Sequence, residues 1–202
     1  MKTFVAINIT EGESKMLNQN ISEQCNKLKL IAFQQDLDQQ CELCKSQEGV
    51  AEMRIDSALD AQINHNHEIK KSNMKIDFLC NDTITVYSYP ELFSQIFINL
   101  INNSIMHAYE KNKEGFILIR VVQKINYIKI IYKDDGKGIS KENLHKIFNP
   151  FYTTNRIDGS VGLGLNVIYN VVQNNLQGNI NYYSRENKGT IFVITIPMLI
   201  NS

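Results

Sequence analysis

The sequence carries no net charge, because its 21 lysine and arginine residues balance 21 aspartate and glutamate residues. The two signs are interspersed, so the composition gives no reason to expect nucleic acid or an anionic membrane as a partner. No stretch approaches the roughly 18 uninterrupted apolar residues of a membrane-spanning helix. Residues 1–7 are too short an apolar run for a signal peptide. These absences favour a cytoplasmic location.

Cysteine is scarce, and its spacing does not build a zinc site. The four cysteines are Cys25, Cys41, Cys44 and Cys80. Cys41 and Cys44 form a CxxC pair, but no second pair follows at zinc spacing. The pair lies in a run with helical periodicity, so we expect its side chains to fill apolar space, with a metal or redox role as the weaker alternative. Without an oxidising compartment, disulfides are not expected.

Two glycine pairs form the clearest motif of the chain. The first, in Asp134-Asp135-Gly136-Lys137-Gly138, follows an apolar run, and the second, in Gly162-Leu163-Gly164-Leu165, opens a helical run. Glycine lets the backbone adopt positive φ and approach a ligand closely. A helix start offers free N–H groups and a positive dipole end, which suit phosphate. The residues between the pairs lack a steady apolar period and indicate a lid, so the stretch predicts a nucleotide site.

A helix with an amide-bearing face lies upstream of the glycine pairs. Four polar residues recur at steps of four and share one face of this helix, namely Gln95, Asn99, Asn103 and His107. The apolar face is supplied by Leu92, Ile96, Leu100 and Ile101. Amide side chains can ligate Mg²⁺ without adding charge, and Mg²⁺ usually keeps waters and substrate phosphates as its other ligands. The helix is therefore a candidate metal-binding element.

Taken in order, these motifs resemble the N, G1, F and G2 boxes of the catalytic ATP-binding domain of sensor histidine kinases. That domain belongs to the superfamily of DNA gyrase B, the MutL repair proteins and the heat-shock chaperone ATPases. The resemblance covers roughly residues 50–197, and four boxes in the right order make it specific. It implies ATP and Mg²⁺ as cofactors, and an enzyme that transfers phosphate from ATP to a protein histidine.

The resemblance also implies roles for individual residues. Asn103 would be the Mg²⁺ ligand, and Asn99 would be catalytic beside it, in the place where gyrase-like relatives carry a water-activating glutamate. Water attack is therefore not favoured. Asp134 would bond the adenine amine with help from Thr190. The other nucleotide-binding residues would be His107, Gly136, Gly138, Phe148, Phe151, Thr154, Arg156, Gly162, Leu163, Gly164 and Leu165.

Two positions depart from the pattern of the kinases. Asn155 and Arg156 follow the Thr-Thr pair, where kinases often carry lysine. Met106 and His107 stand where a basic or aromatic pair often follows the Mg²⁺ asparagine. The negative charge of the phosphates would then be offset by Arg156 or His107.

Helical and strand patterns alternate along residues 50–197. We expect a short strand over 50–55, a helix after Asp56, and strands over 75–80 and 83–87 joined by a turn at Asn81-Asp82. Hairpins are expected over 115–133 and 179–197. The predicted fold is α+β, a two-layer α/β sandwich in which a mixed, mostly antiparallel sheet carries helices on one face, preceded by a long N-terminal helix.

The N-terminal helix is predicted from two displaced apolar stripes between residues 13 and 47. It either packs on its own domain or, as we favour, is a remnant of the dimerising hairpin that precedes the catalytic domain of histidine kinases. Residues 1–48 would form this helical segment, a candidate homodimer element, and residues 49–202 the catalytic domain.

The chain offers no good phosphate acceptor. Its histidines are His65, His67, His107 and His145, and none precedes residue 60. His67 and Glu68 superficially resemble the acceptor motif but lie inside a predicted helix without a following proline. The acceptor would therefore be supplied by the dimerisation domain of a sensor kinase, with a response regulator acting indirectly as a further partner. We expect either a fragment of a larger kinase or a stand-alone chain that acts on a partner.

Three functions stay open at this stage. The favoured one is the catalytic portion of a sensor histidine kinase. The second is a catalytically silent ATP-binding regulatory module, and the third is an ATPase or a serine kinase of the anti-sigma type.

Overall fold

The computed structural model of the chain describes residues 51–65, 69, 72–80, 84–110, 113–154 and 161–198. The predicted N-terminal helix, Cys41 and Cys44, His67 and Arg156 lie outside these residues. The described elements are β1 (Ala51–Arg54), α2 (Ile55–His65), β2 (Met74–Cys80), β3 (Thr85–Ser88), α4 (Pro90–Asn103), η1 (Ser104–Ala108), β4 (Gly115–Gln123), β5 (Tyr127–Asp134), α5 (Lys141–Leu144), α6 (Gly164–Asn170), η2 (Val171–Asn175), β6 (Asn179–Ser184) and β7 (Thr190–Pro197).

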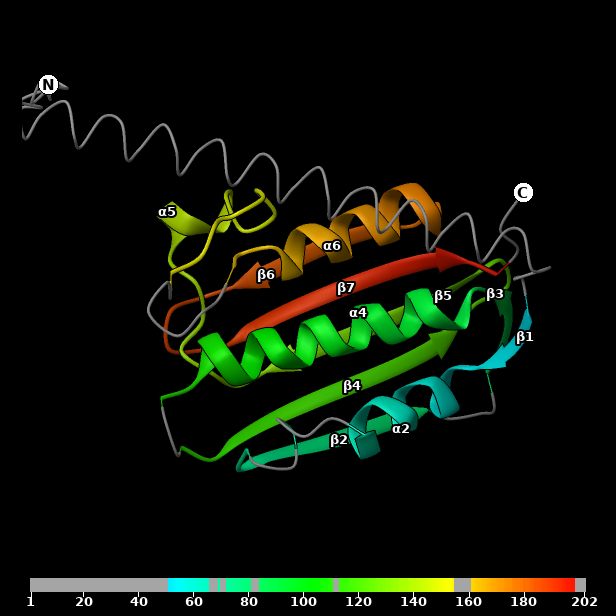
Figure 1. Ribbon diagram of the computed structural model, residues 1–202, viewed down its shortest axis with the longest axis horizontal. Coiled ribbons are helices and arrows are strands. Elements are labelled where there is room, and N and C mark those ends of the chain that lie inside the picture. Colours follow the sequence, from blue (N-terminus) through cyan, green and yellow to red (C-terminus); the bar gives the residue numbers. More distant parts are fainter. Residues whose placement is uncertain are drawn as a thin grey trace, which may run out of the picture. The chain divides into compact units, whose positions relative to one another are not determined.

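A five-stranded sheet in the order β2-β4-β5-β7-β6 forms one layer, and β1 and β3 form a separate antiparallel pair. Only β2 and β4 run parallel within the large sheet, because the other three pairings are antiparallel. The helices α2, α4 and α6 lie together on one face of this sheet (Figure 1). The predicted two-layer α+β sandwich is confirmed for the described residues.

Strand alternation builds the core between these layers. Every second residue of the three central strands is buried towards the helices, as in Ile128, Ile130 and Tyr132 of β5. From α4, Phe93, Ile96, Phe97, Leu100 and Ile101 are fully or almost fully buried. Burying one such side chain contributes about 1.5–3 kcal/mol, so α4 is held firmly against the sheet. The rigid α4 in turn fixes the amides on its other face.

One pairing differs from the prediction. The strands expected over 75–80 and 83–87 do form, as β2 and β3, but they do not pair with each other. β3 pairs with β1. β2 pairs in parallel with β4, which follows α4 in the sequence. A parallel pair needs a long crossover, and α4 supplies it. The two hairpins predicted around β4–β5 and β6–β7 are confirmed.

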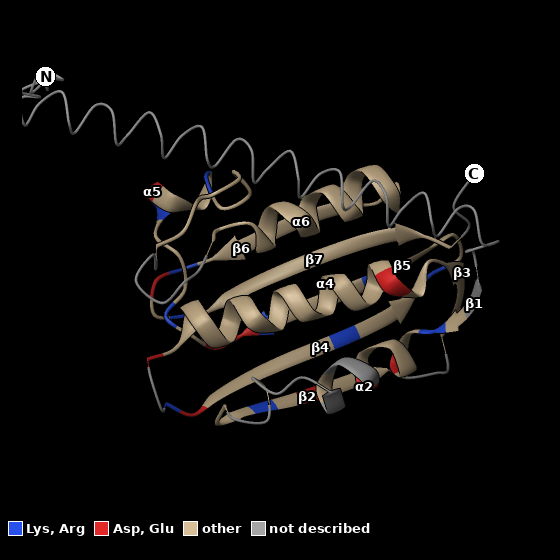
Figure 2. Ribbon diagram, in the orientation of Figure 1, with Lys and Arg blue, Asp and Glu red and all other residues tan. Residues whose placement is uncertain are grey.

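Charged residues of both signs are scattered along the described ribbon (Figure 2). None of the described helices is long and apolar enough to cross a membrane.

Candidate functional site

A cavity of about 350 Å³ lies where α4, η1, the end of β5, the 138–154 segment and the start of α6 meet. This volume falls within the range of about 300–1,000 Å³ that is usual for small-ligand sites. The lining residues are Asn99, Asn102, Asn103, Ser104, Met106, His107, Ala108, Asp134, Gly138, Ile139, Asn143, Ile147, Tyr152, Thr153, Thr154, Val161, Gly162, Leu163, Gly164, Leu165, Thr190 and Phe192.

The amide face of α4 meets the second glycine pair at this cavity. Asn99 and Asn103 lie one turn apart, and both approach Gly164 so closely that an added Cβ would be 3.2 Å from Asn103 Nδ2 and 3.3 Å from Asn99 Oδ1. Asn99 Nδ2 donates to the Gln95 carbonyl at 2.9 Å, which leaves its Oδ1 available as an acceptor. Glycine at position 164 therefore lets the first turn of α6 lie directly against the two amides.

The Asn103 amide is the least satisfied group on this face. Its Nδ2 is buried and has no hydrogen-bond partner among the described residues. A buried donor without a partner costs about 1–3 kcal/mol, so such a group beside a cavity suits a bound ligand. Rotating the amide by half a turn would present its oxygen instead, which Mg²⁺ prefers.

No cluster of three or more His, Cys, Asp or Glu side chains that could hold a metal occurs in the described part of the chain. A divalent cation at Asn99 and Asn103 would therefore take uncharged amide oxygens from the protein. Mg²⁺, which fills its remaining positions with waters and substrate phosphates, fits this donor set.

Asp134 closes the other end of the cavity. Its side chain is 3% exposed, and Oδ1 accepts backbone N–H bonds from Gly136 at 3.0 Å and Thr190 at 3.2 Å. Oδ2 takes only a long contact of 3.4 Å from the Ser104 hydroxyl. Burial raises the pKa of Asp134, while the two backbone bonds act in the opposite direction. The carboxylate is thus locked through one oxygen and keeps the other as an acceptor.

Hydroxyl groups surround this carboxylate. The hydroxyl of the fully buried Tyr132 donates to Ser104 Oγ at 2.8 Å. Thr190 Oγ1 lies 3.0 Å from Ser184 Oγ. Ser184 Oγ also accepts the Ile139 N–H at 2.8 Å. These bonds tie β5 to η1, and β6 to β7 and to the segment at Ile139, so this end of the cavity is built before any ligand arrives.

The first glycine pair makes room for protein neighbours. Gly138 has φ +68°, and a Cβ there would lie 2.1 Å from the Arg185 carbonyl oxygen. A Cβ at Gly136 would lie 2.5 Å from Ala108. Gly138 lines the cavity and Gly136 does not. The two glycines therefore shape the cavity by admitting the neighbouring segments that form its wall.

The predicted lid is anchored by Phe148. Its ring packs against Tyr169, Tyr182 and Phe192, with centroids 5.3, 5.2 and 6.5 Å away. The carbonyl oxygen of Phe148 accepts a 3.0 Å bond from Asn166 of α6. Phe148 does not line the cavity, although the nearby Tyr152, Thr153 and Thr154 do.

Phe151 and Gly162 meet where the two ends of the lid approach each other. Phe151 has φ +62° and Gly162 has φ +73°, and a Cβ on Gly162 would lie 2.7 Å from the Phe151 carbonyl carbon and the Tyr152 oxygen. Only glycine fits at position 162. Phe151 itself does not line the cavity. The lid residues 155–160, including Arg156, lie outside the described residues.

The structure thus brings eleven of the fifteen predicted site residues to one cavity. They are Asn99, Asn103, His107, Asp134, Gly138, Thr154, Gly162, Leu163, Gly164, Leu165 and Thr190. Gly136, Phe148 and Phe151 lie in the surrounding wall. Half the lining was not predicted, including Asn102, Ser104, Met106, Ala108, Ile139 and Phe192.

The π-helical turn η1 explains several of these omissions. Four-residue steps on an α-helix placed only His107 after Asn103 on the polar face. In the structure the helix widens after Asn103, and Ser104, Met106, His107 and Ala108 all reach the cavity. Such turns occur frequently at functional sites.

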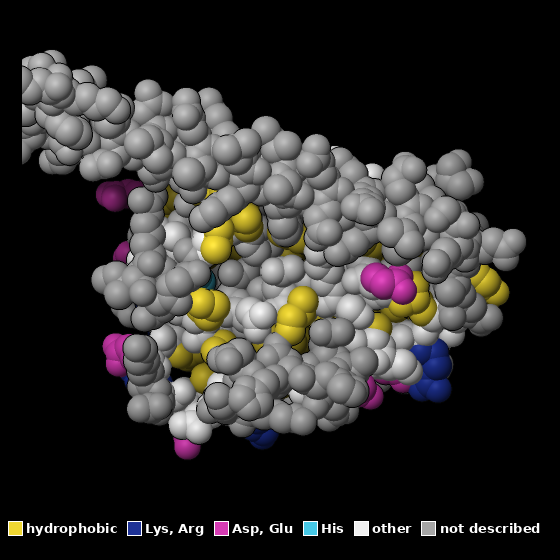
Figure 3. Space-filling model, in the orientation of Figure 1, with side chains coloured by type: hydrophobic (Ala, Val, Ile, Leu, Met, Phe, Trp, Pro, Cys, Tyr) yellow, Lys and Arg dark blue, Asp and Glu magenta, His cyan; other side chains and the backbone are white. Residues whose placement is uncertain are grey.

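Hydrophobic side chains also reach the surface on the helical side of the molecule (Figure 3). Two of the cavity-lining side chains, Met106 and Val161, are 41% and 52% exposed.

Comparisons with known proteins agree with this geometry. Residues 88–200 match the family model described as histidine kinase-, DNA gyrase B- and HSP90-like ATPase. Sporulation kinase E of Bacillus subtilis is 34% identical over 144 residues, which are 71% of this chain and 18% of that protein. The sensor histidine kinase ZraS of Escherichia coli K12 is 29% identical over 193 residues, which are 93% of this chain and 38% of that protein.

Among solved structures, the nucleotide-free catalytic domain of histidine kinase ThkA is similar, with a TM-score of 0.64 and 27% identity. The match covers 74% of this chain and 95% of that domain. The chain spans well under half the length of the two kinases above.

Proposed function

The chain belongs to the family of histidine kinase-, DNA gyrase B- and HSP90-like ATPases, and from this we propose that it binds ATP with Mg²⁺ and transfers phosphate to a histidine on a dimerisation domain. The acceptor histidine would not belong to this chain but to the dimerisation domain of a sensor kinase. A response regulator would then receive the phosphate in two-component signalling.

The observation that carries the proposal is the meeting of three distant segments at one cavity. Asn103 from α4, Asp134 from β5 and Gly164 from α6 all line it. Asp134 offers an acceptor oxygen at a buried end, which suits the exocyclic amine of adenine. Asn103 offers, beside the glycines, an amide whose nitrogen bonds to none of the described residues, which suits Mg²⁺ and phosphate. A nucleotide spanning these points would contact all three segments.

Phosphoryl transfer depends mostly on position and on charge stabilisation. Bound ATP with Mg²⁺ would supply the phosphoryl group and neutralise its charge. Asn103 would hold the metal with Asn99 beside it, and the first turn of α6 at Gly164 and Leu165 would direct N–H groups to the phosphates. An amide at position 99 is not a base, so it would not activate water, and transfer to a protein acceptor is favoured over hydrolysis.

The remaining roles are assigned on the same basis. Gly136 and Gly138 would shape the adenine pocket through the neighbours they admit, and Phe148 and Phe151 would anchor the lid. His107 lines the cavity and Arg156 belongs to the lid, so either would offset phosphate charge. Residues 1–48 would be a helical segment derived from a dimerisation hairpin, and would support a homodimer.

Labelled ATP incubated with the chain and an intact kinase hairpin tests the proposal. We expect label on the hairpin histidine, and we expect it to disappear in Asn103→Ala. ATP binding without transfer would instead support a silent regulatory module, which the exposed Met106 in place of a basic residue favours. Phosphate release that depends on Asn103 would support an ATPase, and absence of ATP binding would contradict all three readings.

A further inference from the structure

The segment that follows the amide helix is fastened to the end of β5 by a tyrosine. The Tyr109 hydroxyl donates to Asp135 Oδ1 at 2.8 Å and lies 3.1 Å from the Phe116 carbonyl oxygen. Tyr109 directly follows η1, which contributes Ser104, His107 and Ala108 to the cavity, and Asp135 directly follows Asp134. The one hydroxyl therefore joins the segment after η1 to the end of β5, two neighbouring segments that both contribute to the cavity.

The acceptor of this bond is itself held in place. Asp135 Oδ1 also accepts the Phe116 N–H at 2.9 Å, and the Asp135 N–H donates to the Phe116 carbonyl at 3.2 Å. These paired bonds tie the end of β5 to the start of β4. A second link runs beside them, because the Lys137 N–H donates to the Ala108 carbonyl at 2.8 Å. Together with the 3.4 Å bond from the Ser104 hydroxyl to Asp134 Oδ2, these bonds set the position of Asp134 relative to η1.

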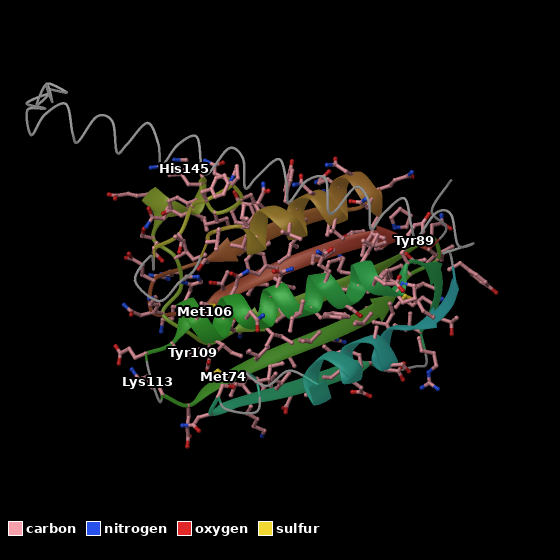
Figure 4. All side chains as sticks on the ribbon, viewed as in Figure 1. Met74, Tyr89, Met106, Tyr109, Lys113 and His145 are labelled. Carbon is pink, nitrogen blue, oxygen red and sulfur yellow. The ribbon has the colours of Figure 1, made fainter. Side chains whose placement is uncertain are left out.

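The Tyr109 ring is seated as closely as its hydroxyl. A Cβ added to Gly115 would lie 2.4 Å from Tyr109 Cε1 and 2.7 Å from Met74 Sδ, so the ring fills the space above a glycine. Figure 4 shows Tyr109 between Met106 and Met74 at this end of the sheet. Burial, with a smaller contribution from Asp135, raises the pKa of Tyr109, so the phenol stays protonated and remains a donor at neutral pH.

We propose that Tyr109 and Asp135 are positioning residues, whose hydrogen bond sets the spacing between η1 and Asp134 at the adenine end of the cavity. This inference rests on the proposed function, because it assigns the spacing to adenine binding. Neither residue lines the cavity, so each acts through a neighbour: Tyr109 through His107 and Ala108, and Asp135 through Asp134. A π-helical turn is a rare conformation, and an anchor immediately after it would keep its side chains in place.

The bond acts at the adenine end, so its loss has a distinctive signature. Tyr109→Phe keeps the ring over Gly115 and removes only the hydroxyl. We expect it to weaken the binding of ATP, ADP and adenosine by the same factor, about 3- to 10-fold, which is the scale of one hydrogen bond. A change at the phosphate end, such as Asn103→Ala, would instead weaken ATP more than adenosine.

Calorimetric titration of the full chain with ATP, ADP and adenosine tests this. The set comprises the unaltered chain, Tyr109→Phe, Asp135→Ala, Asp135→Asn and the double variant Tyr109→Phe with Asp135→Ala. Tyr87→Phe, on an exposed tyrosine of β3, is the matched control and should bind as the unaltered chain does. Asp135→Asn retains an acceptor oxygen and should recover most of the affinity lost in Asp135→Ala. The double variant should bind as Asp135→Ala does.

Three results would overturn the inference. They are unchanged affinity in Tyr109→Phe, a loss confined to ATP, and additive losses in the double variant. A fall in thermal midpoint without a fall in affinity would show a merely structural bond and would also overturn it. Absence of ATP binding by the unaltered chain would overturn the proposed function together with this inference. Equal ATP affinity of the unaltered chain and Tyr109→Phe would overturn the inference alone.

Discussion

The two ends of the cavity are built differently. Around Asp134, the carboxylate takes two backbone N–H bonds, and the hydroxyls of Tyr132, Ser104, Ser184 and Thr190 form two bonded pairs beside it. Around Asn103, the buried amide nitrogen has no partner in the part of the chain that the structure describes, glycines replace side chains, and exposed Val161 borders the space. The Asp134 end is held in one arrangement by protein bonds and keeps one carboxylate oxygen as an acceptor, whereas the Asn103 end leaves a buried donor without a partner among the described residues.

This difference suggests a division of labour. A preformed end costs little to organise on binding and can select a ligand by the direction of its hydrogen bonds. An end lined by glycine and the Asn103 amide can follow a ligand whose charge and geometry change during a reaction. We therefore expect the Asp134 end to govern affinity and base selectivity, and the Asn103 end to govern phosphoryl transfer.

The largest effect should come from Asn103→Ala, which removes the amide at the open end. We expect transfer to a kinase hairpin to fall by about 100-fold or more, the scale of losing one group that stabilises the transition state. Adenosine affinity should stay within about twofold of the unaltered chain. Radiolabel transfer and calorimetry measure the two quantities. Equal losses in transfer and adenosine affinity would remove the proposed division between the ends.

Asp134→Asn should act at the preformed end. An amide that presents a donor where the carboxylate accepted would weaken ATP, ADP and adenosine alike by about 1–3 kcal/mol, the scale of a buried bond to a charged group. Calorimetric titration with each ligand measures this. Asp60→Asn, on an exposed aspartate of α2 away from the cavity, provides a control with the same chemical change. Unchanged ATP affinity in Asp134→Asn would refute the assigned role.

Gly162→Ala should test whether the backbone at position 162, beside Phe151 and Tyr152, needs glycine. Its φ of +73° and the 2.7 Å approach to Tyr152 predict a destabilisation of about 1–3 kcal/mol. The neighbouring Val161→Ala, on an exposed side chain, should leave the free energy of unfolding almost unchanged. Denaturant unfolding of both variants gives the comparison. Equal stability of the two would mean that the backbone at 162 relaxes freely.

The smallest effect should be the pH dependence at Asp134. Burial raises its pKa, so the carboxylate that accepts an amine is lost at a higher pH than for an ordinary aspartate. ATP affinity should therefore fall as pH is lowered through this raised pKa. The stability of the unliganded chain should change in the opposite sense, decreasing as pH rises from the ordinary aspartate range, because the folded state binds this proton more tightly.

ATP affinity by calorimetry and the free energy of unfolding by denaturant are measured against pH for the unaltered chain and for Asp134→Asn. The comparison separates the effect of Asp134 from that of His107, which also lines the cavity. The asparagine variant should lack both trends. Identical profiles in the two proteins would assign the dependence to another group.

The sequence was sufficient to predict the elements and most of the site, because each motif combines a local pattern with a chemical requirement. Asn99 and Asn103 were predicted from their four-residue spacing, and Gly138 and Gly162 from the need for positive φ, which the structure confirms for both glycines. The β4–β5 and β6–β7 hairpins were predicted because their strands are close in sequence.

Other features depend on contacts that a linear pattern does not encode. β2 pairs with β4 because α4 carries the chain across the sheet between them. The alternation of apolar residues within 75–80 gives no information about which strand will be the partner. Ser104 and Met106 reach the cavity because the helix changes to a π turn at Ser104. The Tyr109–Asp135 bond joins residues 26 positions apart, so only the folded chain brings them together.

A crystal structure of the chain with Mg²⁺ and a non-hydrolysable ATP analogue would test the central claim most directly. The account predicts the adenine amine within hydrogen-bond distance of Asp134 Oδ2, the metal against the Asn103 amide, and the phosphates beside Gly162 and Gly164. An analogue bound elsewhere, or bound with its base directed away from Asp134, would contradict it.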